Sequence, residues 1–135
     1  MGTIQRWPAY FNTMNQKSSS IEAGFEAETR ALAFLKTQQL SFIYRNFRCK
    51  QGEIDLIMQE KDTLVFVEVR KRSHLEYGSG LDSVTTHKQQ RLVRAATVYL
   101  LEQSLYEKII CRFDIVSIDK NGEMTWIKNA FELVY

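Results

Sequence analysis

The sequence predicts a single α/β domain in which two helices flank a mixed β-sheet, with the elements in the order α-β-β-β-α-β. Two segments carry apolar residues at the three- and four-residue spacing of amphipathic helices. Between and after them lie runs rich in branched and aromatic residues, which are typical of strands. The length of 135 residues suits one domain. Helices packed against a mixed sheet are the simplest way to bury such elements.

The first helix is expected to begin near Ser19, because Ser19 and Glu22 have the spacing of a capping box. The chain before it, residues 1–18, is predicted to be a flexible arm, and residues 19–135 to be the folded domain. Glu28 falls into a gap in the apolar stripe of this helix, so its carboxylate is expected on the side that packs against the sheet. The stripe consists of Ile21, Phe25, Leu32 and Leu35.

Three strands are predicted next, at residues 40–48, 53–59 and 63–70. Lys61 and Asp62 form the expected turn between the second and the third strand. A second helix is predicted over residues 87–103, where Leu92, Ala96, Tyr99 and Gln103 share one stripe.

A fourth strand is expected at residues 112–119. The Asn121-Gly122 pair is a strong hairpin signal, and residues 124–127 would return as a short edge strand.

The central hairpin places acidic residues together. If Lys61 and Asp62 form a two-residue turn, Asp55 lies opposite Glu68, and Glu53 lies opposite Arg70. Opposed like charges are unfavourable, so a bound cation, Arg70 or a raised pKa must compensate. The opposite face of this hairpin is expected to be apolar, with Ile54, Leu56, Met58, Val65, Val67 and Val69.

Two rigid carboxylates with an open side suit magnesium, which prefers oxygen ligands, water and substrate phosphates. Glu28 would add a third carboxylate if the first helix packs on this side of the sheet. The alternative is a salt-bridge network with no metal, in which Glu53 and Arg70 also take part.

The bulk composition excludes few functions. The net charge of +2 is too small to predict nucleic-acid binding by itself. Cys49 and Cys111 lack the spacing of a metal site, so we expect two reduced cysteines in a cytoplasmic protein. No apolar run is long enough to span a membrane, and no membrane partner is expected.

Several motifs of the chain form a combined pattern. They are Glu28, Gly52-Glu53-Ile54-Asp55-Leu56-Ile57, Val65-Phe66-Val67-Glu68-Val69-Arg70, Arg45-Asn46-Phe47-Arg48, Lys88-Gln89-Gln90-Arg91-Leu92 and Arg112-Phe113-Asp114. Together these motifs resemble the YraN family of bacterial proteins. The fold of that family is similar to those of Holliday junction resolvases and restriction endonucleases. The resemblance covers roughly residues 20 to 120 and implies a restriction endonuclease-like α-β-β-β-α-β core.

The wider group comprises the PD-(D/E)xK nucleases, which cleave phosphodiesters with a bound metal. The resemblance implies that Asp55 is the metal-binding aspartate, Glu68 the glutamate of the E-x-K element and Glu28 the helix glutamate. It therefore implies Mg²⁺ or Mn²⁺ held by Glu28, Asp55 and Glu68, and a nuclease or nuclease-like protein acting on DNA, including branched DNA.

One position departs from this pattern, because Arg70 stands where E-x-K has lysine. Arginine stays protonated, so it cannot be a general base, although it can stabilise charge on phosphate. Lys88 precedes Leu92 by four residues and is expected to point inward from the second helix; the alternative is a side chain that extends to solvent. The expected catalytic set is Asp55, Glu68, Arg70 and Lys88.

The arginine leaves a second function open, namely a non-catalytic nucleic-acid-binding or adaptor domain with a degenerate site. Basic residues near the acidic end of the hairpin would contact phosphates in either case. For Arg91 and Arg94 a solvated helix face is the simpler expectation, and Asp114 is expected to pair with Arg112 or with a neighbouring basic residue. The oligomeric state stays open, a homodimer included. The basic residues near the hairpin are Arg45, Arg48, Lys50, Arg70, Lys71 and Arg72.

Overall fold

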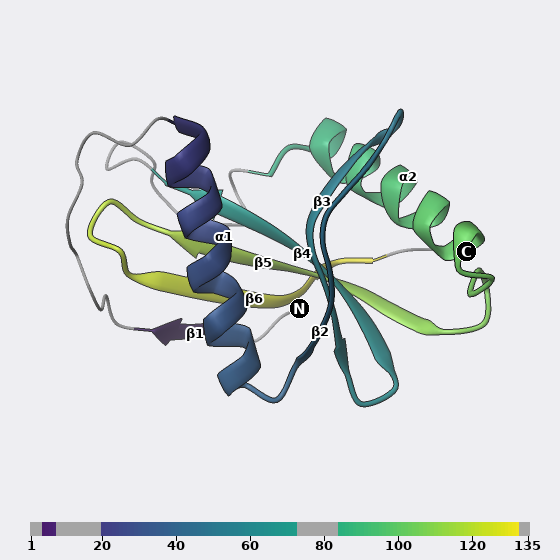
Figure 1. Ribbon diagram of the computed structural model, residues 1–135, viewed down its shortest axis with the longest axis horizontal. Helices are drawn as coiled ribbons and strands as arrows, with labels where there is room; N and C mark the ends of the chain where they lie inside the picture. The colour runs from purple at the N-terminus through teal and green to yellow at the C-terminus, as the bar shows by residue number, and fades with distance from the viewer. Residues whose placement is uncertain (1–3, 8–19, 73–83, 133–135) are drawn as a thin grey trace.

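The computed structural model describes residues 4–7, 20–72 and 84–132. Figure 1 shows α1 lying across one face of a twisted sheet and α2 running alongside the hairpin of β2 and β3. The elements are β1 (Ile4–Trp7), α1 (Ser20–Thr37), β2 (Ser41–Cys49), β3 (Gly52–Glu60), β4 (Thr63–Lys71), α2 (Thr86–Glu102), β5 (Ile110–Ile118) and β6 (Met124–Phe131).

The sheet has the strand order β1-β6-β5-β4-β3-β2. β4 and β5 are parallel, and every other neighbouring pair is antiparallel. The parallel pair requires a crossover, which α2 supplies. The predicted α/β class with an α-β-β-β-α-β core and a mixed sheet is therefore confirmed. β6 runs to Phe131, four residues beyond the expected edge strand.

β6 is not the edge of the sheet, because β1 pairs with it from Ile4↔Ile127 to Trp7↔Met124. The sequence had suggested a flexible arm over residues 1–18, whereas residues 4–7 form this edge strand. The physical reason is that a bare β6 edge offers unpaired N–H and C=O groups to any extended segment that reaches it. Residues 1–3 and 8–19, including the expected cap Ser19, lie outside the described residues.

The core beneath α1 is apolar and well filled. Phe34 packs edge-on against Trp126, with ring centroids 5.6 Å apart. Phe25 was expected in the buried stripe, but 56% of its surface is exposed. The stripe that faces the sheet is rotated, because small alanines allow close contact between α1 and the strands. From residue 22 on, where burial in α1 is described, its buried residues are Ala27, Ala31, Phe34 and Leu35.

The core beneath α2 is aromatic. The ring of Phe66 lies between Tyr99 and Phe113, and Phe113 stacks on Phe131 at 4.7 Å between centroids. α2 begins after Thr85, whose Oγ1 accepts the N–H of Lys88 at 3.1 Å. This cap satisfies a free amide of the first turn. The buried residues of α2 are Leu92, Ala95, Ala96, Tyr99 and Leu100.

The predicted register of the central hairpin is confirmed from Glu60↔Thr63 to Leu56↔Val67. Lys61, in the two-residue turn, has φ 52°. Ile54 was expected on the face of Leu56 and Met58, but it packs in the cluster beneath α2 instead. The alternation breaks here because the paired ladder stops at Leu56, and the chain beyond it follows β2 rather than β4.

None of the helices among the described residues is long and apolar enough to cross a membrane.

Candidate functional site

The acidic site lies where β3 and β4 separate. Beyond the Leu56↔Val67 pair, the side chain of Asp55 replaces the backbone ladder: its Oδ2 accepts the N–H of Val69 at 2.8 Å. A carboxylate from β3 is thereby anchored to the backbone of β4, one residue after Glu68. The local loss of strand pairing is what makes room for two acidic side chains.

Asp55 and Glu68 lie close enough to share a hydrogen bond. Burial, the negative charge of Glu68 and this shared hydrogen bond raise the pKa of Asp55 to about 7, against the lowering effect of the Val69 amide. Glu68 itself is only 7% exposed. The two carboxyl groups are therefore neighbours, as expected. Their like charges are accommodated by the raised pKa of Asp55 and by the loss of strand pairing beyond Leu56.

Lys88 supplies the positive charge of the site. Its Nζ lies 3.1 Å from Oε1 of Glu68, and its side chain is 40% exposed. The expectation that Lys88 points inward from α2 is confirmed by this contact. The Thr85 cap sets the first turn of α2 and so fixes where Lys88 leaves the helix.

Glu28 borders the site but is held by another residue. Nε of Arg45 lies 3.4 Å from Oε1 of Glu28. Burial and the charge of Asp55 raise the pKa of Glu28, while Arg45 and Asn46 act to lower it. Arg45 also donates to the carbonyl of Phe25 at 2.7 Å and lies over its ring at 3.8 Å, so one guanidinium ties β2 to α1.

The structure does not bring Arg70 and Glu53 together as expected. The register of β3 and β4 ends before that pair, and Glu53 faces Arg48 of β2, with 3.4 Å between Nε and Oε2. Arg70 lies beside Ser117 of β5. Its buried Nε has no hydrogen-bond partner, and no ion pair to Arg70 is found among the described residues.

A cleft of about 320 Å³ opens between β3, β4 and α2 at this site. It exposes Glu68 and Lys88 to a ligand. His87 and Arg91 also line it, although a solvated helix face was the simpler expectation for Arg91 and no role was expected for His87. Their four-residue spacing on a helix was the available signal. The lining residues are Glu53, Glu68, His87, Lys88, Arg91 and Leu92.

The residues fit a hard cation only in part. Asp55 and Glu68 present adjoining carboxyl oxygens, the donor type that magnesium prefers. Across residues 4–7, 20–72 and 84–132, however, no three Asp, Glu, His or Cys side chains form a ready metal-binding group. Glu28 is the expected third ligand, and its ion pair with Arg45 competes with that role.

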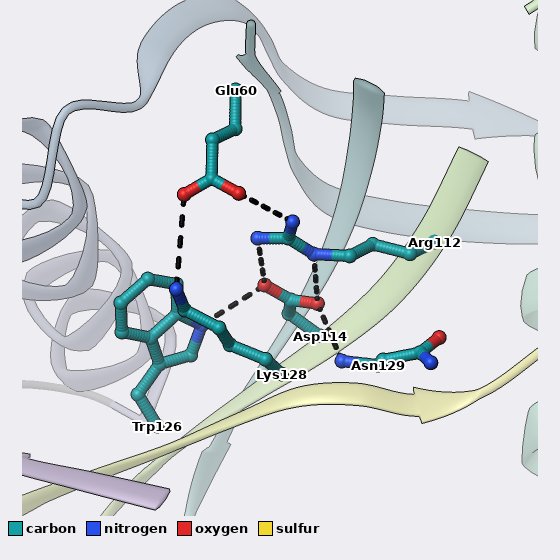
Figure 2. A network of polar contacts seen from close by, with 6 residues as sticks. All are labelled: Glu60, Arg112, Asp114, Trp126, Lys128 and Asn129. Carbon is teal, nitrogen blue, oxygen red and sulfur yellow. Dashed lines mark hydrogen bonds and ion pairs between the residues drawn. The ribbon is translucent and has the colours of Figure 1, made fainter. Parts of the chain in front are cut away.

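A second polar cluster lies away from this site, between β3, β5 and β6 (Figure 2). The carboxylate of Asp114, 1% exposed, accepts four hydrogen bonds: two from Arg112, one from Nε1 of Trp126 at 3.0 Å and one from the N–H of Asn129 at 2.9 Å. Arg112 also pairs with Glu60. The expected Arg112–Asp114 pair is confirmed, and its satisfied bonds indicate a structural role.

Comparison with known proteins shows the family. The family model described as "Uncharacterised protein family UPF0102" matches residues 27–118. A UPF0102 protein of Coxiella burnetii (strain RSA 331) is 51% identical over 112 residues, 83% of this chain and 93% of the relative.

Two further relatives give the same result. A UPF0102 protein of Pseudomonas putida (strain W619) is 46% identical over 120 residues, which cover 86% of this chain and 98% of the relative. A UPF0102 protein of Legionella pneumophila (strain Philadelphia 1) is 46% identical over 112 residues, which cover 82% of this chain and 95% of the relative. The family model begins within α1 and spans the acidic hairpin, α2 and β5. This chain therefore belongs to the UPF0102 family, the YraN family that its motifs resemble.

Proposed function

We propose that this protein is a metal-dependent nuclease that hydrolyses phosphodiester bonds in DNA, branched DNA included. The observation that carries the proposal is the neighbouring pair of Asp55 and Glu68. Asp55 accepts the N–H of Val69, the residue after Glu68, and Glu68 lines an open cleft with its Oε1 3.1 Å from the ammonium of Lys88. A buried acidic pair is costly, and a strongly shifted pKa in a cleft is typical of functional sites.

Asp55 and Glu68 are the residues that would hold Mg²⁺ or Mn²⁺, with Glu28 as a third ligand once it leaves Arg45. A bound metal would polarise the phosphate and lower the pKa of the attacking water. Both carboxyl groups must then be ionised, so the proton that Asp55 retains below pH of about 7 has to leave first.

The remaining roles belong to cationic side chains. Lys88 contacts Glu68 and lines the cleft, so its ammonium is placed to neutralise charge on a phosphate bound there. Arg70 stands two residues after Glu68 on β4 and retains an unpartnered Nε. We assign Arg70 to phosphate binding, because a guanidinium stays protonated and cannot accept a proton.

The test incubates purified protein with branched, duplex and single-stranded DNA in Mg²⁺ or Mn²⁺. We expect metal-dependent cleavage that falls by about a hundredfold or more in Asp55→Asn, as when one charge-stabilising group is removed from an active site. Asp62→Asn is the matched control, because Asp62 is an exposed carboxylate in the β3–β4 turn. No cleavage, or equal cleavage by Asp55→Asn, would reject the catalytic proposal.

A second candidate is a non-catalytic nucleic-acid-binding or adaptor domain with a degenerate PD-(D/E)xK site. Arg70 at the lysine position and the ion pair between Glu28 and Arg45 favour it. Binding to DNA that survives EDTA and the Asp55→Asn change, without cleavage, would support this candidate over the nuclease.

We also propose a cytoplasmic location, which agrees with the two reduced cysteines expected from the sequence, Cys49 and Cys111. Reactivity of both thiols in freshly prepared protein would agree with it.

A further inference from the structure

The exposed side of α2 has a one-sided charge. From Thr86 to Leu101 the helix contains His87, Lys88, Arg91 and Arg94 but no aspartate or glutamate, although the whole chain is nearly neutral. Lys88, Arg91 and Arg94 lie in the first half of the helix, where its dipole is positive and carboxylates would be more favourable. Helix stability therefore does not explain their placement.

Three of these residues form a stripe. His87, Arg91 and Arg94 follow the i, i+4, i+7 spacing, so they lie on one side of α2 over about 10 Å, and all three are exposed. We call them the α2 basic stripe.

The arginines of this stripe differ from others in the described chain. Arg91 and Arg94 form no ion pair within residues 4–7, 20–72 and 84–132. By contrast, Arg30 donates to the carbonyl of Gly122 at 2.7 Å, and Arg45 and Arg112 pair with carboxylates. The stripe therefore keeps its charge available to a partner.

The stripe also leads to the acidic site. His87 and Arg91 line the cleft that contains Glu68 and Lys88. Arg94 also lines a second hollow of about 360 Å³, together with the amide side chains of Gln89 and Gln90 and the carboxylate of Glu132. Amides and guanidinium groups are donors of the kind that bind phosphate and sugar oxygens.

We propose that the α2 basic stripe binds the sugar–phosphate backbone of a nucleic-acid strand and directs it into the cleft beside Glu68. The inference rests on the proposed function and adds to it which surface holds the substrate. A strand presents one phosphate per about 3.4 Å of axis, so about three phosphates match the length of the stripe. Backbone contacts of this type read no sequence, so binding is expected with little sequence preference.

The test measures binding without chemistry. The full chain, in EDTA, is titrated against short fluorescein-labelled single-stranded and duplex DNA at several salt concentrations, with anisotropy as the readout. For the double variant Arg91→Gln/Arg94→Gln we expect affinity to fall about tenfold or more. The slope of log affinity against log salt should decrease by about one to two, one for each lost phosphate contact.

The matched control is Lys108→Gln/Lys120→Gln, which removes the same charge from two exposed lysines outside α2. We expect this control to retain the salt slope of the wild type. If both double variants lost DNA affinity and salt slope equally, the effect would come from net charge alone, and the proposal would be overturned. Circular dichroism and the melting temperature of each variant establish that α2 is still folded, and Arg91→Lys/Arg94→Lys should restore the slope.

Failure of this inference is distinguishable from failure of the proposed nuclease. An unchanged salt slope in Arg91→Gln/Arg94→Gln, with metal-dependent cleavage intact, would overturn only the proposed binding role of the α2 basic stripe. A reduced slope without any cleavage would support the stripe and reject the nuclease. Polyglutamate is the competing probe: equal displacement of DNA by this acidic polypeptide at the same charge concentration would indicate a protein partner and overturn the proposal.

Discussion

Asp55 shows how a single residue couples protonation to stability. Its pKa is about 7 in the folded chain against an ordinary value of 3.8, first because it is buried and next because of Glu68. Between these two values the folded state binds more protons than the unfolded state. The free energy of unfolding should therefore fall as pH rises from about 4 to about 7, and then level off.

The Asp55→Asn variant tests this coupling, because an amide has no proton to lose in this range. In metal-free buffer we expect it to be more stable than the wild type by up to about 4 kcal/mol at pH near 8, and nearly equal at pH of about 4 and below. Urea denaturation across this pH range measures the difference. Parallel pH profiles for the two proteins would contradict the assignment of the raised pKa to Asp55.

Lys88 gives a second prediction at this scale. Lys88→Met removes the cation beside Glu68. We expect this variant to be less stable than the wild type by only about 1 kcal/mol, because Lys88 is 40% exposed and solvent screens its ion pair with Glu68. Chemical denaturation near neutral pH measures this cost. Lys71→Met is the control, since Lys71 is exposed and has no ion pair in the described part of the chain. Equal effects from both changes would show that the contact with Glu68 contributes nothing.

At the scale of the elements, Gly52 sets how closely α2 approaches the turn between β2 and β3. A Cβ at Gly52 would lie 2.9 Å from the backbone oxygen of Arg91, which is closer than real Cβ contacts. The Gly therefore allows the helix that carries Lys88 and Arg91 to pack against the strand that carries Asp55.

We expect Gly52→Ala to lower the free energy of unfolding by about 1–3 kcal/mol, because backbone has to move to relieve the contact. Gly24→Ala is the matched control: a Cβ at Gly24, within α1, meets nothing within 4 Å. Alanine there should instead stabilise by about 0.5–1 kcal/mol. Thermal and urea denaturation of both variants check the opposite signs, and a neutral Gly52→Ala would show that α2 adjusts freely.

At the scale of the whole molecule, the buried carboxylate of Asp114 joins strands that are distant in the sequence. Its four hydrogen bonds reach β6 through Trp126 and Asn129, and Arg112 extends the network to Glu60 of β3 (Figure 2). Lys128 completes it, with Nζ 3.8 Å from Glu60 and 4.5 Å from the ring centroid of Trp126. The network thus spans the sheet from β3 to β6.

Asp114→Asn should therefore destabilise the chain by about 3–5 kcal/mol, because Arg112 loses its buried counter-charge and two acceptor sites change. Asp62→Asn, an exposed carboxylate, should change stability by less than about 0.5 kcal/mol. Equilibrium unfolding in urea measures both. A small effect of Asp114→Asn would mean that the network is replaceable, and loss of DNA binding in fully folded Asp114→Asn would contradict its structural role.

Much of the fold was predictable because its signals are local. Helical spacing located α1 and α2, and the two-residue turn at Lys61 and Asp62 determined the β3–β4 register that brings Asp55 toward Glu68. A hairpin register follows from turn length alone, so it needs no knowledge of the rest of the chain. The roles of Asp55, Glu68, Arg70, Lys88 and Glu28 in catalysis or metal binding stay predictions.

Other features depended on partners that the sequence does not reveal. Phe25 belongs to the helical apolar pattern, yet it is exposed, because α1 is turned so that alanines face the sheet. The guanidinium of Arg45 covers the ring of Phe25. Ile54 follows the strand alternation, yet it packs beneath α2 because β3 leaves β4 at Asp55.

The sequence by itself determined the order of the elements, the central register and the acidic residues of the hairpin, since each depends on spacing within a short segment. Only the tertiary structure decided that Glu68 meets Lys88, that Glu28 is held by Arg45 and that residues 4–7 close the β6 edge. These contacts join segments far apart in the chain. Their choice among competing partners is made by packing and charge in three dimensions, which a local pattern does not encode.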